Sequence, residues 1–159
     1  MLLGAILWLG ATNVRAIIGA ELLETWTMTL LPGLQENFQR EIFRLISYSS
    51  LIVIGGYLIA FFSAVTFVKT TSITVKQEGW LMMSAILFFM FSPVEFYTMY
   101  LDGRMAILEL FSHPALEELQ RLFIHRLAAL AGVPMIALLS YYTIIGLAIW
   151  QPMKKKGQG

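Results

Sequence analysis

The sequence contains no cysteine among its 159 residues. Disulfide bonds, thiolate metal sites and cysteine nucleophiles are therefore excluded, and the redox compartment stays open. Charged residues are scarce, at 13% of the chain, whereas soluble domains carry about 25%. Because the formal net charge is only +1, the sequence predicts no nucleic-acid partner.

Sequence signatures of catalysis are missing as well. The chain has no His-x-x-x-His pair, no Gly-x-Ser-x-Gly turn and no glycine-rich phosphate loop, so metal-dependent hydrolysis and nucleophilic catalysis have no support. The connections between its apolar segments are too short to form a separate soluble domain. We expect no metal site and no catalytic activity of the chain's own.

The chain is rich in apolar residues. They make up 58% of the chain, and the mean hydropathy is +0.72. About 20 apolar residues in a helix match the hydrocarbon core of a bilayer. The sequence predicts an all-α polytopic membrane protein, a four-transmembrane-helix bundle forming one integral membrane domain over 1–159, with spans at about 2–20, 45–68, 80–101 and 122–150.

The first span is predicted to be retained, because it lacks the basic leader and cleavage site of a signal peptide. Residues 35–44 are polar with apolar residues at helical spacing. They form either an amphipathic helix on the membrane or the leading turns of the second span. Asp102-Gly103-Arg104 is typical of a turn that ends the third span, and Pro134 of a kink in the fourth.

The lysines predict the orientation. With four spans, both termini and the connection 69–79 lie on one side, which then holds all five lysines: Lys69, Lys76, Lys154, Lys155 and Lys156. Cytoplasmic loops carry excess Lys and Arg. We therefore expect a multi-pass protein of the bacterial cytoplasmic (inner) membrane with both termini cytoplasmic, although four arginines fall on the far side: Arg40, Arg44, Arg104 and Arg121.

Ionisable residues inside the apolar segments predict an intramembrane polar cluster. Arg15 and Glu95 both lie about 21–23 Å from the inner boundary at 1.5 Å per residue. Arg126 enters from the outer side, and Asn13 is close to Arg15 in sequence. We expect Glu95 to pair with Arg15 or, second, with Arg126. The cluster is either a proton, ion or quinone-headgroup site or a pair that orders the bundle.

Small residues recur every four positions and predict close helix packing. Gly56, Ala60 and Ala64 form such a ridge on the second span. Thr12, Ala16 and Ala20 form one on the first span, and Gly132 belongs to a third on the last. These ridges offer packing surface for helices of this chain or of a partner.

A haem would need two facing histidines, but His113 and His125 lie 12 positions apart, about 18 Å along one helix. A single axial ligand, His125, could hold a haem or a chlorophyll-type pigment shared with a partner chain. A quinone at the polar cluster is the other cofactor that the sequence leaves open.

Three functions remain after these exclusions. The first is a non-catalytic accessory or scaffolding subunit of a larger membrane protein complex, with electron transport as the expected setting. The second is a small oligomeric transporter or channel-like protein that uses Arg15 and Glu95. The third is a haem- or pigment-carrying subunit that uses His125. The expected partners are other membrane subunits and lipid, or further copies of the chain.

Overall fold

The computed structural model describes residues 2–24, 29–71, 78–112 and 114–152. Of these residues 88% are helical, and none belongs to a strand. Four long helical segments are apolar enough to cross a membrane. The predicted all-helical class and the four long apolar segments are confirmed for this part of the chain.

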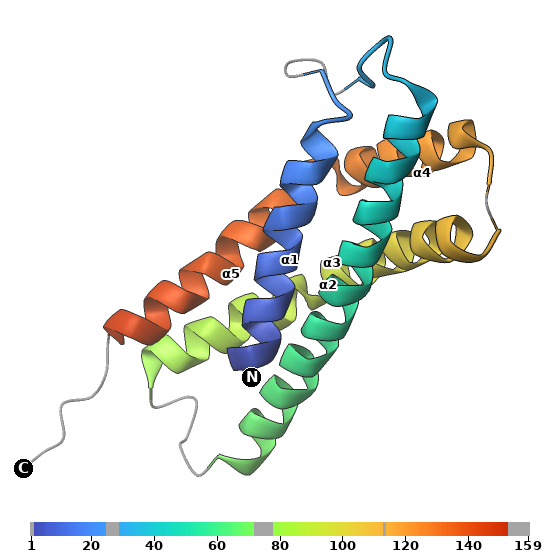
Figure 1. Cartoon of the computed structure of the whole chain (residues 1–159). Coiled ribbons are helices and arrows are strands. Elements are labelled where there is room, and N and C mark those ends of the chain that lie inside the picture. The colour runs from blue at the N-terminus through green and yellow to red at the C-terminus, as the bar shows by residue number, and fades with distance from the viewer. Residues whose placement is uncertain (1, 25–28, 72–77, 113, 153–159) are drawn as a thin grey trace, which may run out of the picture. The chain divides into compact units, whose positions relative to one another are not determined.

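The described residues form five α-helices, whose course along the chain can be followed in Figure 1. Their bounds are α1 Leu2–Ala20, α2 Glu36–Thr70, α3 Gly79–Ile107, α4 Leu116–Ala128 and α5 Val133–Trp150. A π-helical turn, Leu108–Ser112, extends α3, and a 3-10 turn, Ala129–Gly132, separates α4 from α5. By their contacts the residues fall into two compact units, which are described separately. The first unit is Met1–Ala64 with Thr98–Ala129, and the second is Val65–Tyr97 with Leu130–Gly159.

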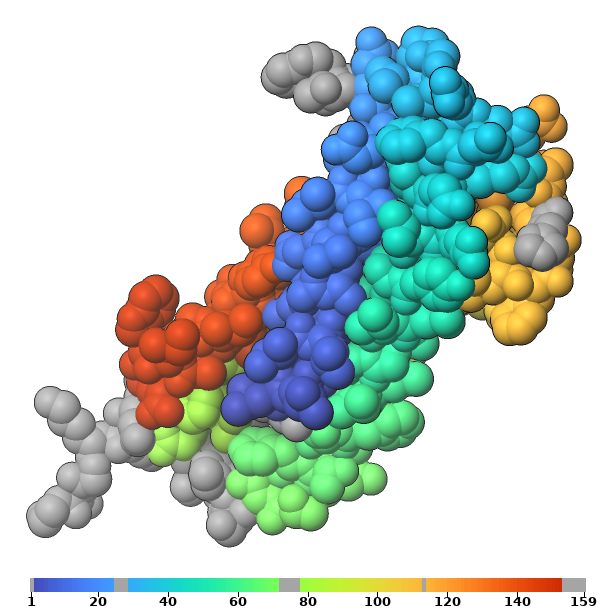
Figure 2. Space-filling view, viewed as in Figure 1, coloured from blue at the N-terminus to red at the C-terminus, as the bar shows by residue number. Residues whose placement is uncertain are grey.

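Helices α1 and α2 of the first unit run side by side, and their atoms meet along the seam (Figures 1 and 2). Two glycines make this approach possible. A Cβ added at Gly56 would lie 2.6 Å from the backbone N of Trp8, and one added at Gly4 would lie 2.7 Å from the backbone N of Ala60. Because real Cβ atoms do not approach backbone so closely, both positions require glycine.

Helix α2 is longer than a membrane crossing requires. Its 35 residues extend about 52 Å, whereas the hydrocarbon core is about 30 Å thick. The apolar stretch 51–68, between the hydroxyl-rich Ser47–Ser50 and Lys69, is about 27 Å long. Residues 36–44 continue the same helix without a break. Of the two interpretations of this segment, the structure therefore supports the leading turns of the second span.

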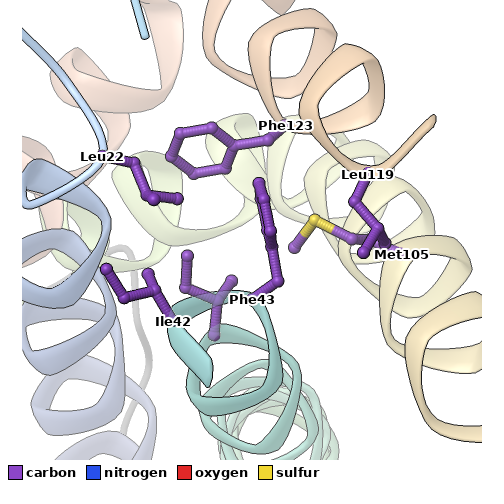
Figure 3. Close-up of a cluster of buried hydrophobic side chains, with 7 residues drawn as sticks. Leu22, Ile42, Phe43, Met105, Leu119 and Phe123 are labelled. Atoms are coloured by element: carbon purple, nitrogen blue, oxygen red, sulfur yellow. The ribbon is translucent and has the colours of Figure 1, made fainter. Parts of the chain in front are cut away.

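A cluster of buried apolar side chains lies beside these leading turns (Figure 3). Leu22, Phe43 and Phe123 converge there, and the rings of Phe43 and Phe123 meet edge to face at 5.8 Å between centroids. The other members come from α2, α3 and α4: Ile42, Ile46, Met105 and Leu119. The cluster joins four parts of the first unit much as the core of a soluble domain does.

The predicted turn at Asp102-Gly103-Arg104 is wrong, because α3 continues through it to Ile107. The buried residues Leu101, Asp102 and Met105 recur at helical spacing, so this segment has an inward face to pack. A lone glycine costs a helix only about 1 kcal/mol, and tertiary packing outweighs that cost here.

The predicted fourth span, 122–150, is not one regular helix. Its backbone turns left-handed at Leu130 (φ 62°), Ala131 (φ 44°) and Gly132 (φ 87°). Gly132 was predicted to pack against a helix, but a Cβ there would meet nothing within 4 Å. It precedes the first residue of α5, and Pro134 lies in the first turn of α5, where a missing N–H costs little.

The second unit contains the first part of α3 and α5. The rings of Phe88 and Tyr141 meet edge to face at 6.0 Å, and Ala137 and Tyr141 are buried. Pro93 lies within α3, which continues past it. Many apolar side chains of α5 remain exposed: Met135, Ile136, Leu139, Ile145, Ile149 and Trp150.

Candidate functional site

Asp102 is the centre of the polar cluster of the first unit. Its side chain is 1% exposed and receives an arginine on each oxygen. Arg15 Nη1 donates to Oδ2, and Arg126 Nε donates to Oδ1 at 3.0 Å. Arg15 Nη1 also donates to the hydroxyl of Ser50 at 3.3 Å. This Asp102 cluster therefore joins α1, α2, α3 and α4 at one point.

Helical periodicity brings each member inward. On α1 the buried residues Gly4, Trp8, Arg15 and Gly19 share one face. On α2, Ser50 lies on the buried face that also carries Ser47 and Val53. The ion cluster is thus built from the same faces that make the helix contacts.

The electrostatics of the cluster depend on its burial. Arg15 is 7% exposed, and Ser50 is fully buried. An ionised carboxylate at such a position must be paired and hydrogen-bonded. Two guanidinium groups meet this requirement for Asp102, and loss of one partner from a buried pair costs about 3–5 kcal/mol. The arrangement can fix the positions of four helices and hold a fixed charge.

The level of the cluster along α2 follows from Ser50. This residue immediately precedes the apolar stretch 51–68, which is about 27 Å long, close to the thickness of the hydrocarbon core. If that stretch crosses a bilayer, the Asp102 cluster lies where hydrocarbon meets headgroups. The charges then lie at the polar edge and not at the centre, which reduces their cost.

The structure brings together two of the four residues predicted for the polar cluster, Arg15 and Arg126. Asn13 is exposed, and its side-chain nitrogen donates to the carbonyl of Leu9 at 2.8 Å. Glu95 is half-buried on α3 and belongs to the second unit. Its pairing with Arg15 or Arg126 stays a prediction.

Sequence reasoning missed Asp102 and Ser50. Asp102 was assigned to a turn because glycine follows it, and Ser50 is one of several neighbouring hydroxyl residues, none of which stands out in the sequence. The spacing of Thr98, Leu101, Asp102 and Met105 is the i, i+3, i+4, i+7 pattern of a helix face. That pattern would have extended the third helix and placed a carboxylate on its inner side.

The predicted packing residues of α2 lie along one side. Gly56 and Ala60 are buried, and both lie against α1. Ala64 is half-buried. On α1 the contacting face is not the predicted ridge, since Ala16 and Ala20 are exposed. The buried face of α1 instead carries Gly4, Trp8, Arg15 and Gly19.

His125 lies on the exposed face of α4. A haem or pigment there would need further ligands or walls from a partner chain. His113 lies outside the described residues. Across the part of the chain that the structure describes, no three His, Asp or Glu side chains gather as a metal site would require. Quinone binding at the predicted polar cluster of Arg15, Glu95, Arg126 and Asn13 stays a prediction.

No family model, curated protein or solved structure matches this chain.

Proposed function

We propose that the chain is a multi-pass protein of a bacterial cytoplasmic membrane and a non-catalytic accessory subunit of a larger membrane complex. Electron transport is the setting in which we expect such a subunit. The observation that carries the proposal is the Asp102 cluster, in which the buried Arg15 is held by Asp102 and Ser50. Charges on three helices that hold one another, together with a hydroxyl from a fourth, favour a structural role.

The exposed apolar surface of α5 agrees with this proposal. Ile145 and Ile149 are 43% and 71% exposed, which is acceptable in lipid or against partner helices but costly in water. A scaffolding subunit needs one part that holds its own shape and another that presents apolar surface. The first unit and α5 supply these two properties.

Gentle purification tests the accessory role. A tagged chain at native expression level is extracted in mild detergent, and its co-migrating chains are identified on native gels. The proposal expects larger chains in fixed stoichiometry. Asp102→Asn should reduce the complex only as far as it reduces the amount of this chain. A homo-oligomer without other chains would contradict the proposal.

Thiol labelling in whole cells tests orientation. Lys76→Cys and Lys155→Cys, both outside the described residues, should be shielded from an impermeant reagent if the lysine-rich side is cytoplasmic. Asn37→Cys, exposed at the start of α2, should be labelled from outside. The reverse pattern would invert the topology, and labelling on both sides would reject four spans.

A transporter or channel-like oligomer is the second candidate. Glu95, half-buried two residues after Pro93 in an apolar helix, favours it, because intramembrane carboxylates often serve proton or ion pathways. A fully assembled Glu95→Gln complex without activity would support this candidate over the first. Visible absorption of the purified wild-type protein would reveal the third candidate, a haem or pigment at His125.

A further inference from the structure

The turn between α4 and α5 has a backbone that its sequence does not favour. Leu130 (φ 62°) and Ala131 (φ 44°) are both left-handed and are followed by Gly132 (φ 87°). Left-handed φ is unfavourable for a residue with a Cβ, and leucine and alanine are among the strongest helix formers. Such a backbone persists only where the surrounding contacts maintain it.

The contacts of α4 within the first unit maintain this turn. Leu119 and Phe123 are buried in the apolar cluster (Figure 3). Arg126 Nε donates to Asp102 Oδ1 at 3.0 Å. Since Arg126 lies four residues before Leu130, the ion pair fixes the last turn of α4 directly beside the left-handed residues.

The buried residues of α4 and α5 are in phase with one uninterrupted helix. Leu119 and Ala137 are buried and lie 18 residues apart, which is five turns of 3.6 residues. Phe123 and Tyr141 are buried as well and have the same separation. Leu130 would lie within about 20° of Leu119 on such a helix. A break at 129–132 removes any need for this phase, so the phase indicates that the segment can also form a continuous helix.

Local preferences at the turn oppose one another. Leu130 and Ala131 favour a helix. Gly132 is a poor helix former, and the ring of Pro134 would crowd the carbonyl of Leu130 in a continuous helix. Because neither backbone suits every residue, the contacts of α4 decide which one forms.

We propose that residues 129–132 switch between the kinked backbone of this structure and a helix that is continuous over Leu116–Trp150. Asp102 holds the kinked form through Arg126. In the continuous form α4 leaves the first unit, and the apolar cluster loses Leu119 and Phe123. Two arrangements of one segment that differ little in free energy form such a switch. The proposal depends neither on the membrane location nor on the accessory role.

Nuclear magnetic resonance at three peptide bonds measures the backbone at the turn. The dipeptide Leu-Ala occurs at 127–128, 130–131 and 147–148. In micelles, a chain with 13C in its leucine carbonyls and 15N in its alanines therefore gives three selected amide signals. Ala128 and Ala148 belong to α4 and α5 and serve as helical references. A strong nuclear Overhauser effect between the amide and α protons of one residue marks positive φ, and among these three the wild type should show it at Ala131 alone.

Two variants should move Ala131 toward the helical references. Arg126→Gln removes the contact with Asp102 but leaves Arg15 bound to it, so a helical Ala131 signal should appear that the wild type lacks. Arg121→Gln, at an exposed position of the same helix, is the charge-matched control and should resemble the wild type. Pro134→Ala decides the outcome if Arg126→Gln fails to fold. It should raise the ratio of continuous to kinked form about a hundredfold, the factor that corresponds to the cost of a proline inside a helix.

Three results would overturn the proposal. A wild-type Ala131 signal like that of Ala128 would show that the turn is not left-handed. A left-handed Ala131 without a helical signal in both Arg126→Gln and Pro134→Ala would show a single fixed turn. Equal helical signals in Arg121→Gln and Arg126→Gln would show that Asp102 is not the contact that holds α4.

Discussion

The two units use the same kind of apolar helix but are held together by different means. In the first unit, backbones touch at Gly4 and Gly56, and an ion cluster and an apolar cluster lie further along the same helices. In the second unit, the rings of Phe88 and Tyr141 meet edge to face, and Leu81, Ala137 and Tyr141 are buried. In the most apolar 18-residue stretch of α1, and in that of α2, 28% of residues are buried, against 11% in the corresponding stretches of Gly79–Ser112 and Leu116–Trp150.

This difference indicates which unit is held together by contacts within the chain. Lipid tails are as apolar as leucine, so helices in a bilayer associate through close packing and polar contacts and gain little from burial. The first unit has both kinds of contact. In the second unit many apolar side chains of α5 remain exposed, so we expect its stability to depend more on the surrounding lipid or on a partner.

Removal of the central charge should have the largest effect. Asp102→Asn leaves Arg15 buried without its carboxylate, and the free energy of unfolding in mixed micelles should fall by about 3–5 kcal/mol. The control Glu117→Gln, at an exposed position of α4, should change it by less than about 0.5 kcal/mol. Equal effects would show that the cluster contributes no more than a surface charge.

Two phenylalanines compare the units directly. Phe43 is fully buried against Phe123 in the first unit, and Phe43→Ala should cost about 3–5 kcal/mol. Phe88 is half-buried against Tyr141 in the second, and Phe88→Ala should cost about 1 kcal/mol, the value of an aromatic pair. A larger loss from Phe88→Ala would reverse the contrast between the units.

Adjacent glycines test the seam. Gly56→Leu places its Cβ against the Trp8 backbone and should cost about 1–3 kcal/mol by forcing the helices apart. Gly55→Leu is the matched control, because a Cβ there meets nothing within 4 Å. The thermal midpoint should fall only for Gly56→Leu. If both variants behave alike, the two helices do not cross at this point.

Glu95→Gln should have the smallest effect on stability. Because Glu95 is only half-buried, we expect a loss of about 1 kcal/mol, the upper value for exposed pairs. If Glu95 pairs with Arg15, the loss from Glu95→Gln combined with Arg15→Gln should be smaller than the sum of the single losses. Additive losses would reject that pairing.

Much of the helical architecture could be predicted from the sequence, because membrane spans are long uniform patterns. The first helix ends where the sequence predicted, at Ala20. The prediction failed where local signals opposed tertiary ones. Asp102-Gly103-Arg104 has the residues of a turn, yet the buried Asp102 continues α3. At Leu130 and Ala131 the backbone leaves the helix, although neither residue favours left-handed φ.

The candidate site was half predicted. A charged residue is easily recognised within an apolar segment, so the sequence identified Arg15 and Arg126 as members of the site. Their carboxylate partner was not, because spacing along the chain gives the depth of a residue but not which helix faces it. Asp102 and Glu95 differ by seven positions, about 10 Å along α3. An estimate of depth along the helix does not distinguish these two carboxylates as partners of Arg15. The packed structure shows that Asp102 binds it.

A double-mutant cycle between Arg15 and Asp102 tests the central claim most directly. Unfolding free energies are measured in mixed micelles for the wild type, Arg15→Gln, Asp102→Asn and the double variant. If Asp102 holds α1 through Arg15, the double variant should be more stable than the sum of the single losses predicts, by about 1–3 kcal/mol. Strictly additive losses would contradict the claim that this ion pair joins the first unit.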